Sequence, residues 1–206
     1  MPFLHVIMGP NGAGKSTFGS DLANGLNVFD SDLKRSALKK EYNKKPKSEW
    51  PKEMQIYTIY QIDEMVNNLC NNIFTEESDR AISFQEDYAF ETPFSYWGMD
   101  HINKFKESGY VVIGHFICLE YIQESYSNVY NRVQRGGHFL FTHEIEWNYS
   151  HCYKNIYEYH NLFNEIHFYD SKVGSDPLLI VSFIEGSVIW HKTLRPNWVE
   201  LISLLN

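Results

Sequence analysis

The segment from Gly9 to Ser16 has the clearest chemistry in this sequence. It reads Gly-Pro-Asn-Gly-Ala-Gly-Lys-Ser and fits the pattern G-x-x-x-x-G-K-[ST] in full, between an apolar run and a helical pattern. Glycines allow successive backbone N–H groups to turn inward around a phosphate, and the positive end of the following helix faces the same anion. The sequence therefore predicts a phosphate-binding loop made of Gly9, Pro10, Asn11, Gly12, Ala13, Gly14, Lys15, Ser16 and Thr17.

Two side chains of this loop have distinct expected tasks. Lys15 supplies a mobile positive charge near the β- and γ-phosphates, and the Ser16 hydroxyl is placed to bind Mg²⁺. ATP and Mg²⁺ are thus the expected cofactors. The loop does not identify the phosphate acceptor, because GTPases, ATPases and small-molecule kinases all share it.

Two aspartates, Asp30 and Asp32, follow a short apolar stretch at 27–29. The carboxyl edge of an open α/β sheet is where ligands bind, and a carboxylate there can accept the proton of an attacking hydroxyl. Aspartate is also a favoured helix N-cap. We interpret Asp30 as a cap and Asp32 as the general base, the latter partly on a family resemblance.

A second polar group, Glu91, Thr92 and Ser95, follows the apolar run 88–90, where Pro93 imposes an extended turn. Glu91 would project from a strand end toward the same crevice and hold an acceptor hydroxyl or the water shell of the metal. A surface glutamate in a loop is the alternative. We expect Asp32, Glu91, Thr92 and Ser95 to bind substrate.

A third group consists of Arg132 and Arg135 followed by Gly136-Gly137-His138. Guanidinium groups beside a flexible glycine turn suit a lid that closes on the transferring phosphate and stabilises its charge. We therefore expect Arg132 and Arg135 to be catalytic and His138 to contact substrate. The same arginines could instead form the solvated end of a helix, which favours cations.

The elements needed to position these groups follow from hydrophobic periodicity. Their order predicts an α/β fold, a P-loop NTPase three-layer sandwich with a mostly parallel central sheet and a C-terminal β-hairpin, in a single domain covering 1–206. The expected strands are 3–8, 27–29, 88–90, 111–119 and 166–169, with a hairpin at 178–183 and 187–191. The expected helices are 16–23, 52–74, 96–107, 120–135, 142–162 and 196–205, and 75–87 is expected to be an exposed connection.

Composition narrows the classes of function. A formal net charge of −8 argues against a general nucleic-acid surface, and the basic patch at 34–47 is interpreted as a solvated helix end and loop. No apolar run approaches the roughly 20 residues that a membrane helix needs, so a cytoplasmic protein is expected. The widely spaced Cys70, Cys118 and Cys152 suggest neither a disulfide framework nor a zinc site.

With these pieces in order, the chain resembles the zeta-toxin family of P-loop kinases over most of its length, to about Ser171. The matching segments are Gly9 to Thr17, Asp30-Ser31-Asp32, Phe90-Glu91-Thr92 with Ser95, Gly109-Tyr110-Val111-Val112, Arg132-Val133 with Gly136-Gly137-His138, and Tyr169-Asp170-Ser171. Characterised members resemble sugar-nucleotide kinases that phosphorylate the amino-sugar part of UDP-N-acetylglucosamine. The resemblance implies that Asp32 is the base, that Glu91 binds the acceptor and that Arg132 stabilises the transferring phosphate, with a possible antitoxin protein as partner.

The sequence departs from this family at two arginine positions, where Asn128 stands and where the stretch 145–149 has no arginine. Three hypotheses therefore remain. The leading one is transfer of the γ-phosphate of ATP to a hydroxyl of a small or sugar-nucleotide acceptor. The second is an ATP-binding module that acts by conformational signalling, which the missing arginines favour. The third is a nucleoside or polynucleotide kinase, which would need a basic groove.

Overall fold

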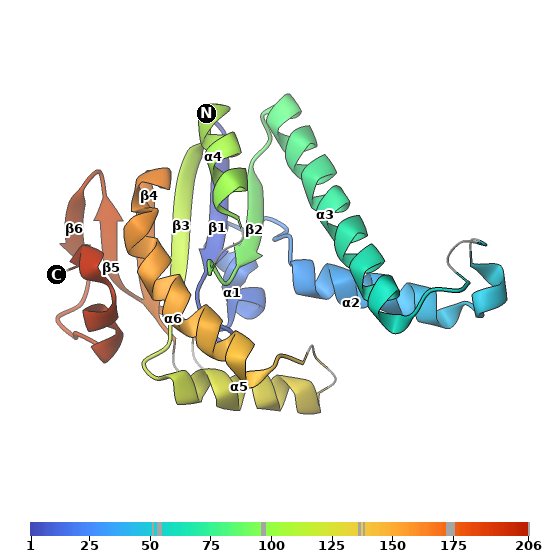
Figure 1. Ribbon diagram of the computed structural model, residues 1–206. Helices are drawn as coiled ribbons and strands as arrows, with labels where there is room; N and C mark the ends of the chain where they lie inside the picture. Colours follow the sequence, from blue (N-terminus) through green and yellow to red (C-terminus); the bar gives the residue numbers. More distant parts are fainter. Residues whose placement is uncertain are drawn as a thin grey trace.

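The computed structural model describes residues 1–50, 52, 55–95, 98–135, 137, 139–171 and 176–205. A six-stranded sheet forms its centre, in the order β2-β1-β3-β4-β5-β6 (Figure 1). The strands β1 to β4 pair in parallel, and β5 and β6 add to the edge as an antiparallel hairpin. The strands are β1 Phe3–Met8, β2 Tyr88–Thr92, β3 Val111–Cys118, β4 Glu165–Asp170, β5 Leu178–Ile184 and β6 Ser187–Trp190.

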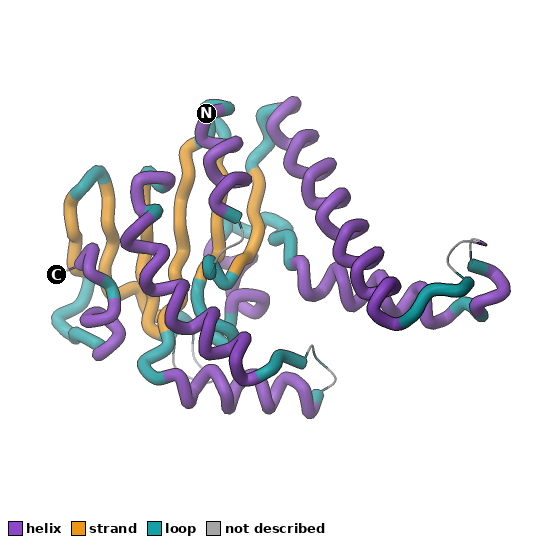
Figure 2. Tube along the Cα trace, viewed as in Figure 1, coloured by secondary structure: helices purple, strands orange, loops and turns teal. Residues whose placement is uncertain are grey.

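Helices cover both sides of this sheet (Figure 2). The α-helices are α1 Lys15–Leu22, α2 Ser31–Lys44, α3 Ile59–Phe84, α4 Met99–Glu107, α5 Ile122–Gln134 and α6 Thr142–Glu158. Short 3₁₀ helices occupy Lys47–Glu49, His160–Leu162, Asn197–Leu201 and Ser203–Leu205. The expected α/β sandwich with a mostly parallel sheet and a terminal hairpin is confirmed. Within the described residues, no helix is both long enough and apolar enough to cross a membrane.

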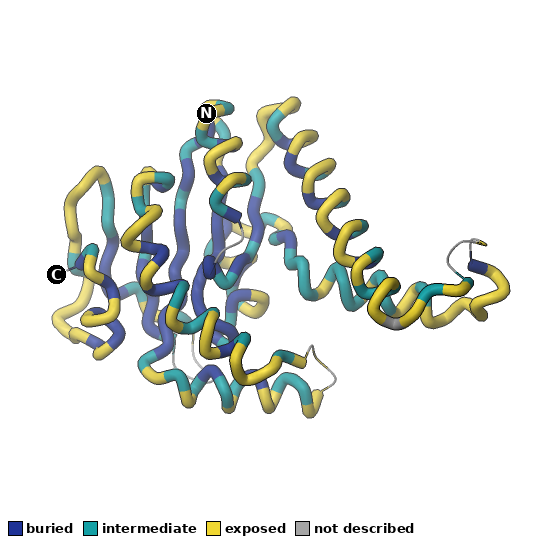
Figure 3. The backbone as a smooth tube through the Cα atoms, viewed as in Figure 1, coloured by how far each residue is buried: buried dark blue, intermediate teal, exposed yellow. Residues whose placement is uncertain are grey.

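The alternation of side chains along β1 explains the two layers of core. Leu4, Val6 and Met8 face the larger core, to which α3, α4 and α6 contribute, while Ile7 faces a smaller core under α1. All four side chains are fully buried. Figure 3 shows that buried residues concentrate along the central strands. The sheet is thus held from both sides at the end of β1, where the phosphate-binding loop begins.

Helix boundaries differ from the expected ones in the second quarter of the chain. α2 is a full helix of 14 residues, although only a helix end and a loop were expected there. α3 begins at a capping box between Thr58 and Gln61 and runs through Phe84, so the predicted exposed connection at 75–87 is wrong. Its acidic residues are the solvated face of a helix whose inner face buries Phe74 and Ala81.

Two further segments differ in type. The stretch 27–29 forms only a single parallel bridge between Phe29 and Phe90, because Asp30 already caps the next helix. The predicted final helix at 196–205 consists of two 3₁₀ segments. Four of its buried residues, Pro196, Val199, Ile202 and Leu205, recur every third position, which is the period at which side chains of a 3₁₀ helix align, and Trp198 is buried beside them.

Candidate active site

The phosphate-binding loop joins the carboxyl end of β1 to the first turn of α1. Gly9, Gly12 and Gly14 have φ angles of 136°, 81° and 97°, in the region that favours glycine. A Cβ atom on Gly9 would lie 2.2 Å from the carbonyl oxygen of Ile117 on the neighbouring strand. These glycines are therefore required by backbone conformation and by close packing against β3.

Lys15 extends back over the loop. Its side chain is 8% exposed, and its Nζ donates hydrogen bonds to the carbonyls of Gly9 and Pro10 at 2.9 and 3.0 Å. Burial lowers the pKa of Lys15, and the nearby carboxylate of Glu91 acts in the opposite direction. An incoming phosphate would offer this ammonium group charged acceptors that are stronger than the two carbonyls.

Ser16 lies between two carboxylates. Its hydroxyl oxygen is 2.9 Å from Asp30 Oδ2 and 3.0 Å from Glu91 Oε1, which brings together the loop, the segment after residue 29 and the end of β2. Burial raises the pKa of Glu91 to about 7, an effect that Lys15 partly offsets. Glu91 Oε2 is buried, and no described residue forms a hydrogen bond with it.

These oxygens suit a Mg²⁺ ion that is shared with a nucleotide. Among the described residues, no group of three or more His, Cys, Asp and Glu side chains is arranged to hold a metal alone. Mg²⁺ usually takes only one or two carboxylates and completes its six oxygen ligands with water and phosphate. The Ser16 hydroxyl and the carboxylates of Asp30 and Glu91 are the hard oxygen donors that such an ion prefers.

Asp30 and Asp32 have different hydrogen-bond partners at the start of α2. Asp30 is the N-cap, since its Oδ1 accepts hydrogen bonds from the backbone N–H groups of Asp32 and Leu33 at 2.8 and 3.0 Å. The expectation of a cap thus agrees with the structure, but Asp30 also reaches Ser16, which the sequence did not reveal. Asp32 Oδ1 accepts a hydrogen bond from Arg35 one turn later.

The other expected substrate residues divide into two kinds. Ser95 is nearly buried and lines the main cavity together with Glu91. Thr92 is 1% exposed, and its hydroxyl accepts a hydrogen bond from the backbone N–H of Phe94 at 2.9 Å. This bond shapes the turn, because Phe94 has a positive φ of 56°. His138 lies outside the described residues.

Arg132 lies in the last turn of α5, Arg135 is the C-cap of this helix, and both line the cavity. Gly137 folds back on that turn, since its N–H donates to the carbonyl of Arg132 at 3.0 Å. A Cβ on Gly137 would lie 2.5 Å from Cγ of Arg132, so a residue with a side chain would push against the arginine stem. Gly136 is outside the described residues.

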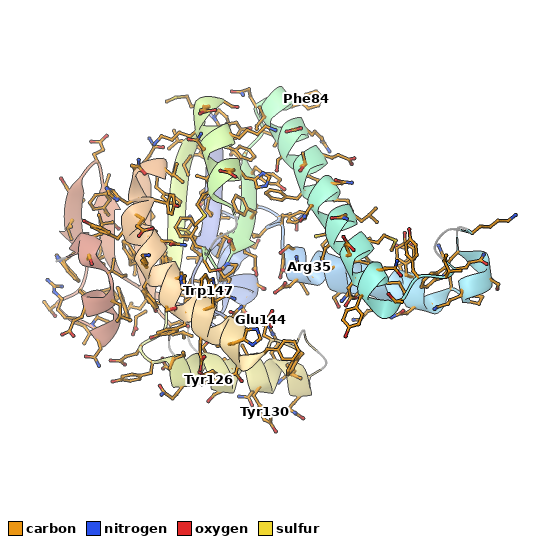
Figure 4. The ribbon with its side chains drawn as sticks, in the orientation of Figure 1. Arg35, Phe84, Tyr126, Tyr130, Glu144 and Trp147 are labelled. Atoms are coloured by element: carbon orange, nitrogen blue, oxygen red, sulfur yellow. The ribbon has the colours of Figure 1, made fainter. Side chains whose placement is uncertain are left out.

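The cavity has a volume of about 1330 Å³ and extends well beyond the phosphate-binding loop. One wall comes from α2 and α3 and includes Arg35, Lys39 and Asn67. The opposite wall comes from α5 and α6. Figure 4 labels Arg35 on α2 and Glu144 and Trp147 on α6, which approach the cavity from its two sides. The space exceeds the roughly 300–1,000 Å³ of an ordinary small-molecule pocket.

Four polar side chains contact the phosphate-binding loop from outside. We call them the loop brace: Ser125 and Asn128 on α5, Asn148 on α6, and Ser171 after β4. Sequence reasoning gave Ser125 no role, and it treated Asn128 and the stretch 145–149, which contains Asn148, as places where an arginine is missing. Both asparagines in fact donate hydrogen bonds to the loop, at 3.0 Å from Asn128 to the Gly12 carbonyl and at 2.8 Å from Asn148 to Asn11 Oδ1.

No protein-family model matches this sequence, and no curated protein matches it. Solved structures do match. The complex of AvrRxo1-ORF1 with AvrRxo1-ORF2 and sulphate ions gives a TM-score of 0.67 at 13% identity, over 94% of this chain and 62% of that chain. The same complex with ATP gives 0.65 at 13% identity, over 93% and 61%. The PezAT chromosomal toxin–antitoxin system of Streptococcus pneumoniae gives 0.57 at 18% identity, over 82% and 67%.

The chain has the fold of a zeta-toxin-type P-loop kinase. At these identities the likeness concerns the fold, and the zeta-toxin-type resemblance expected from the sequence is confirmed at that level. The chain spans somewhat less than two thirds of the AvrRxo1-ORF1 complex chains that it matches. The chemistry of the site in this chain must therefore be argued from its own residues.

Proposed function

We propose that this chain transfers the γ-phosphate of ATP to a hydroxyl of a small or sugar-nucleotide acceptor of the UDP-N-acetylglucosamine type. The observation that carries the proposal is the position of Ser16 between the carboxylates of Asp30 and Glu91, at the mouth of a loop that already encloses Lys15. This arrangement supplies a cation in Lys15, a hydroxyl ligand for a metal in Ser16, and the carboxylates of Asp30 and Glu91 beside that hydroxyl. Phosphoryl transfer from a nucleotide in P-loop proteins uses groups of these kinds.

On the donor side, the backbone N–H groups of the loop and the Lys15 ammonium bind the β- and γ-phosphates. Ser16, with Asp30 or Glu91, would hold Mg²⁺, which neutralises charge on the phosphates when it is bound. Glu91 thus lies on the metal side of the site in this proposal, rather than on the acceptor. A fold neighbour determined with ATP supports nucleotide binding in this class of fold.

On the acceptor side, Asp32 takes the proton of the attacking hydroxyl through the carboxylate that Arg35 orients. The cavity continues from Asp32 along α2, where Lys39 and Lys40 line it with Asn67 of α3. This length and polarity support an extended polar acceptor. Ser95 lines the same cavity, and in this proposal it contacts the acceptor.

Arg132 and Arg135 stabilise the charge that spreads over the transferring phosphate, and His138 contacts substrate in this proposal. Both arginines line the same cavity as the phosphate-binding loop and Asp32, although they lie about a hundred residues further along the chain.

We also propose an antitoxin-like protein partner. The support is that the fold neighbours are a two-protein complex and a toxin–antitoxin system. Co-expression with the product of a neighbouring reading frame, followed by co-purification, tests this part separately.

The test of the main proposal is transfer of labelled phosphate from ATP with Mg²⁺ to UDP-N-acetylglucosamine and to a panel of nucleosides and sugars. Product that forms with the wild type and disappears in Lys15→Ala and Asp32→Asn supports the proposal. Asp21→Asn, an exposed aspartate on α1, is the matched control and should keep full activity. Labelled product that persists in Asp32→Asn would exclude Asp32 as the base.

The alternative, an ATP-binding module without transfer, is favoured by the asparagines at positions 128 and 148, where the zeta-toxin resemblance leads us to expect arginine. It predicts tight nucleotide binding with no labelled product for any acceptor. Binding of ATP that changes the proteolytic sensitivity of α5 and α6, in the absence of product, would favour this second function.

A further inference from the structure

We propose that Asn128 and Asn148 are positioning residues, which hold the phosphate-binding loop in the conformation that directs its N–H groups at phosphate. This inference rests on the proposed nucleotide site and adds a role for two residues that touch the loop instead of the reacting atoms. It also explains what stands at the two positions where the sequence lacks arginine.

The carbonyl groups of the loop provide the first line of evidence, because each one from Gly9 to Ala13 accepts a hydrogen bond from a side chain. Lys15 Nζ serves the carbonyls of Gly9 and Pro10. The remaining three are served by the loop brace, with Ser125 bonded to the carbonyl of Asn11, Asn128 to that of Gly12 and Ser171 to that of Ala13. A carbonyl held on one side leaves the N–H group of the same peptide on the other side, and for the carbonyls of Asn11 and Ala13 these are the N–H groups of Gly12 and Gly14, which can face an anion. The N–H of Ala13 donates to the Pro10 carbonyl at 3.3 Å and closes the turn of the loop.

Asn148 acts on the loop through a side chain rather than through the backbone. Its Nδ2 lies 2.8 Å from Asn11 Oδ1, and Asn11 is only 7% exposed. A buried amide oxygen left without a donor would destabilise this conformation of the loop. The pair therefore fixes the outer turn of the loop to α6, although 137 positions separate the two residues.

Asn128 is matched to its place by size. A Cβ on Gly12 would lie 2.7 Å from Cβ of Asn128, so the loop and α5 are already in close contact at this point. The short asparagine side chain reaches the Gly12 carbonyl at 3.0 Å directly across this contact. A long arginine here would have to leave the loop uncovered or displace α5.

The same contact between α5 and the phosphate-binding loop fixes the position of Arg132. Ser125, Asn128 and Arg132 are spaced three and four residues apart on α5, so they lie on one face of the helix. Two of the three are bonded to the phosphate-binding loop, and the third lines the cavity one turn further on. Attachment of α5 to the loop thus places an arginine at a fixed distance from the bound phosphate.

A positioning role and a lost charge predict different measurements. If Asn128 and Asn148 position the loop, their removal weakens binding of ADP and of a non-hydrolysable ATP analogue by about 5- to 20-fold each, which is the scale of one lost hydrogen bond. If they are only vacated arginine positions, removal leaves nucleotide affinity unchanged, and introduction of arginine raises kcat.

The sharpest test is a double-mutant cycle on the side-chain pair. Asn11→Ala, Asn148→Ala and the double variant are compared with the wild type for ADP binding by titration calorimetry. Because the two side chains bond to each other, we expect the double variant to bind no more weakly than the weaker single variant. Additive losses would overturn the pairing. Asn103→Ala, an exposed asparagine on α4, is the matched control and should bind ADP like the wild type.

Asn128 bonds to a backbone carbonyl, so its test uses side chains of graded chemistry. We expect Asn128→Asp, which keeps the shape but loses the donor, and Asn128→Arg to weaken ADP binding alike, with no gain in kcat for the arginine. Unchanged ADP binding in Asn128→Asp, or a raised kcat in Asn128→Arg, would overturn the proposal. Thermal denaturation shows that each variant is folded before binding is measured.

The same titrations separate this inference from the proposed function. A wild-type protein that binds neither ADP nor the analogue defeats both. A wild type that binds, with variants that bind equally well, defeats only the positioning role of Asn128 and Asn148.

Discussion

The two walls of the cavity are held in contrasting ways. On the α5–α6 side, the loop brace ties two helices to the phosphate-binding loop through buried or half-buried hydrogen bonds. On the opposite side, α2 has no buried residue and extends away from the sheet beside α3 (Figure 1). Exposed ion pairs join α2 to α3, among them Lys39 with Asp63 at 2.8 Å and Lys34 with Glu77 at 3.6 Å.

We relate this difference between the walls to the two substrates of the proposed reaction, the nucleotide and the acceptor. In the proposed reaction the α5–α6 wall lies beside the triphosphate, whose geometry is the same for every nucleotide, and this wall is fixed by directional hydrogen bonds to the phosphate-binding loop. The α2–α3 wall is joined by exposed ion pairs worth only about 0–1 kcal/mol each and by the packing of the partly buried Leu38 against the core. We therefore expect it to adjust more readily than the α5–α6 wall. We therefore expect acceptor specificity to reside on α2 and α3.

The largest effects should come from one substitution in the phosphate-binding loop and one on the acceptor side of the cavity. Lys15→Ala removes the buried ammonium of the loop and should abolish both nucleotide binding and phosphate transfer. Asp32→Asn should lower kcat by about 10²–10⁴-fold, the scale of general-base catalysis, while nucleotide affinity stays within about twofold. Single-turnover transfer and ADP titration on the same preparations measure both quantities.

Equal loss of ADP binding in the two variants would contradict the division between donor and acceptor walls. Lys44→Ala, an exposed lysine at the end of α2, controls for the loss of a positive charge and should leave both quantities unchanged.

The next largest effect concerns the sheet that carries both walls. His115 on β3 is 5% exposed and lies 3.0 Å from His5 and 3.2 Å from the hydroxyl of Tyr169, with the ring of His167 beside it. Burial lowers the pKa of His115 to about 3, and His5 and His167 add to this effect. The unfolded chain takes up this proton near pH 6.5, so folded stability falls as the pH decreases below that value.

Between pH 7 and pH 4 this histidine alone should remove about 3 kcal/mol of unfolding free energy. His115→Gln should flatten that part of the stability profile, measured by urea denaturation at each pH. His143→Gln, at an exposed position, should leave the profile unchanged. An unchanged profile in His115→Gln would place the acid sensitivity elsewhere.

Sequence reasoning located the sheet and the phosphate-binding loop better than it located α2. The loop, β1, β3 and the terminal hairpin have strong local signals, which are a complete motif, apolar runs and turn residues. α2 has none of these, because no residue of it is buried and its polar composition carries no apolar period. The one clear local signal for α2 was Asp30 as a cap. For α3, the T-x-x-Q capping box at Thr58 would have placed the start of the helix.

The loop brace could not be predicted from local pattern. Its hydrogen bonds join residues 114 to 158 positions apart, and serine and asparagine on a helix carry no period or motif. The same holds for Asp30 and Glu91 at Ser16, which only the pairing of strands brings together. The types of residue in the site were thus predictable, but their partners depended on tertiary packing.

A smaller effect should sharpen the role of Glu91 at the boundary between the walls. Its folded pKa is raised to about 7 by burial, so the folded chain keeps a proton that the unfolded chain releases near pH 4.5. Stability contributed by the protonated form is therefore lost as the pH rises from about 4.5 through 7. Glu91→Gln should be about 1–3 kcal/mol more stable than the wild type at pH 8 and equal to it at pH 4.

The same substitution should lower phosphate transfer, because a site that holds a metal and phosphate needs the charged carboxylate. Gain of stability together with loss of activity would identify Glu91 as a residue kept for function. A variant that loses stability at pH 8 would show instead that Glu91 is structural.

The smallest effects compare the two walls directly. Ser125→Ala leaves the carbonyl of Asn11 without its buried donor and should cost about 1–2 kcal/mol of unfolding free energy. Lys39→Ala breaks an ion pair whose side chains are 39% and 45% exposed, and it should cost less than about 0.5 kcal/mol. Urea denaturation at low and high salt measures both, and only the Lys39 variant should converge on the wild type as salt rises. A larger cost for Lys39→Ala than for Ser125→Ala would mean that α2 and α3 form the rigid wall, and acceptor specificity would then have to come from α5 and α6.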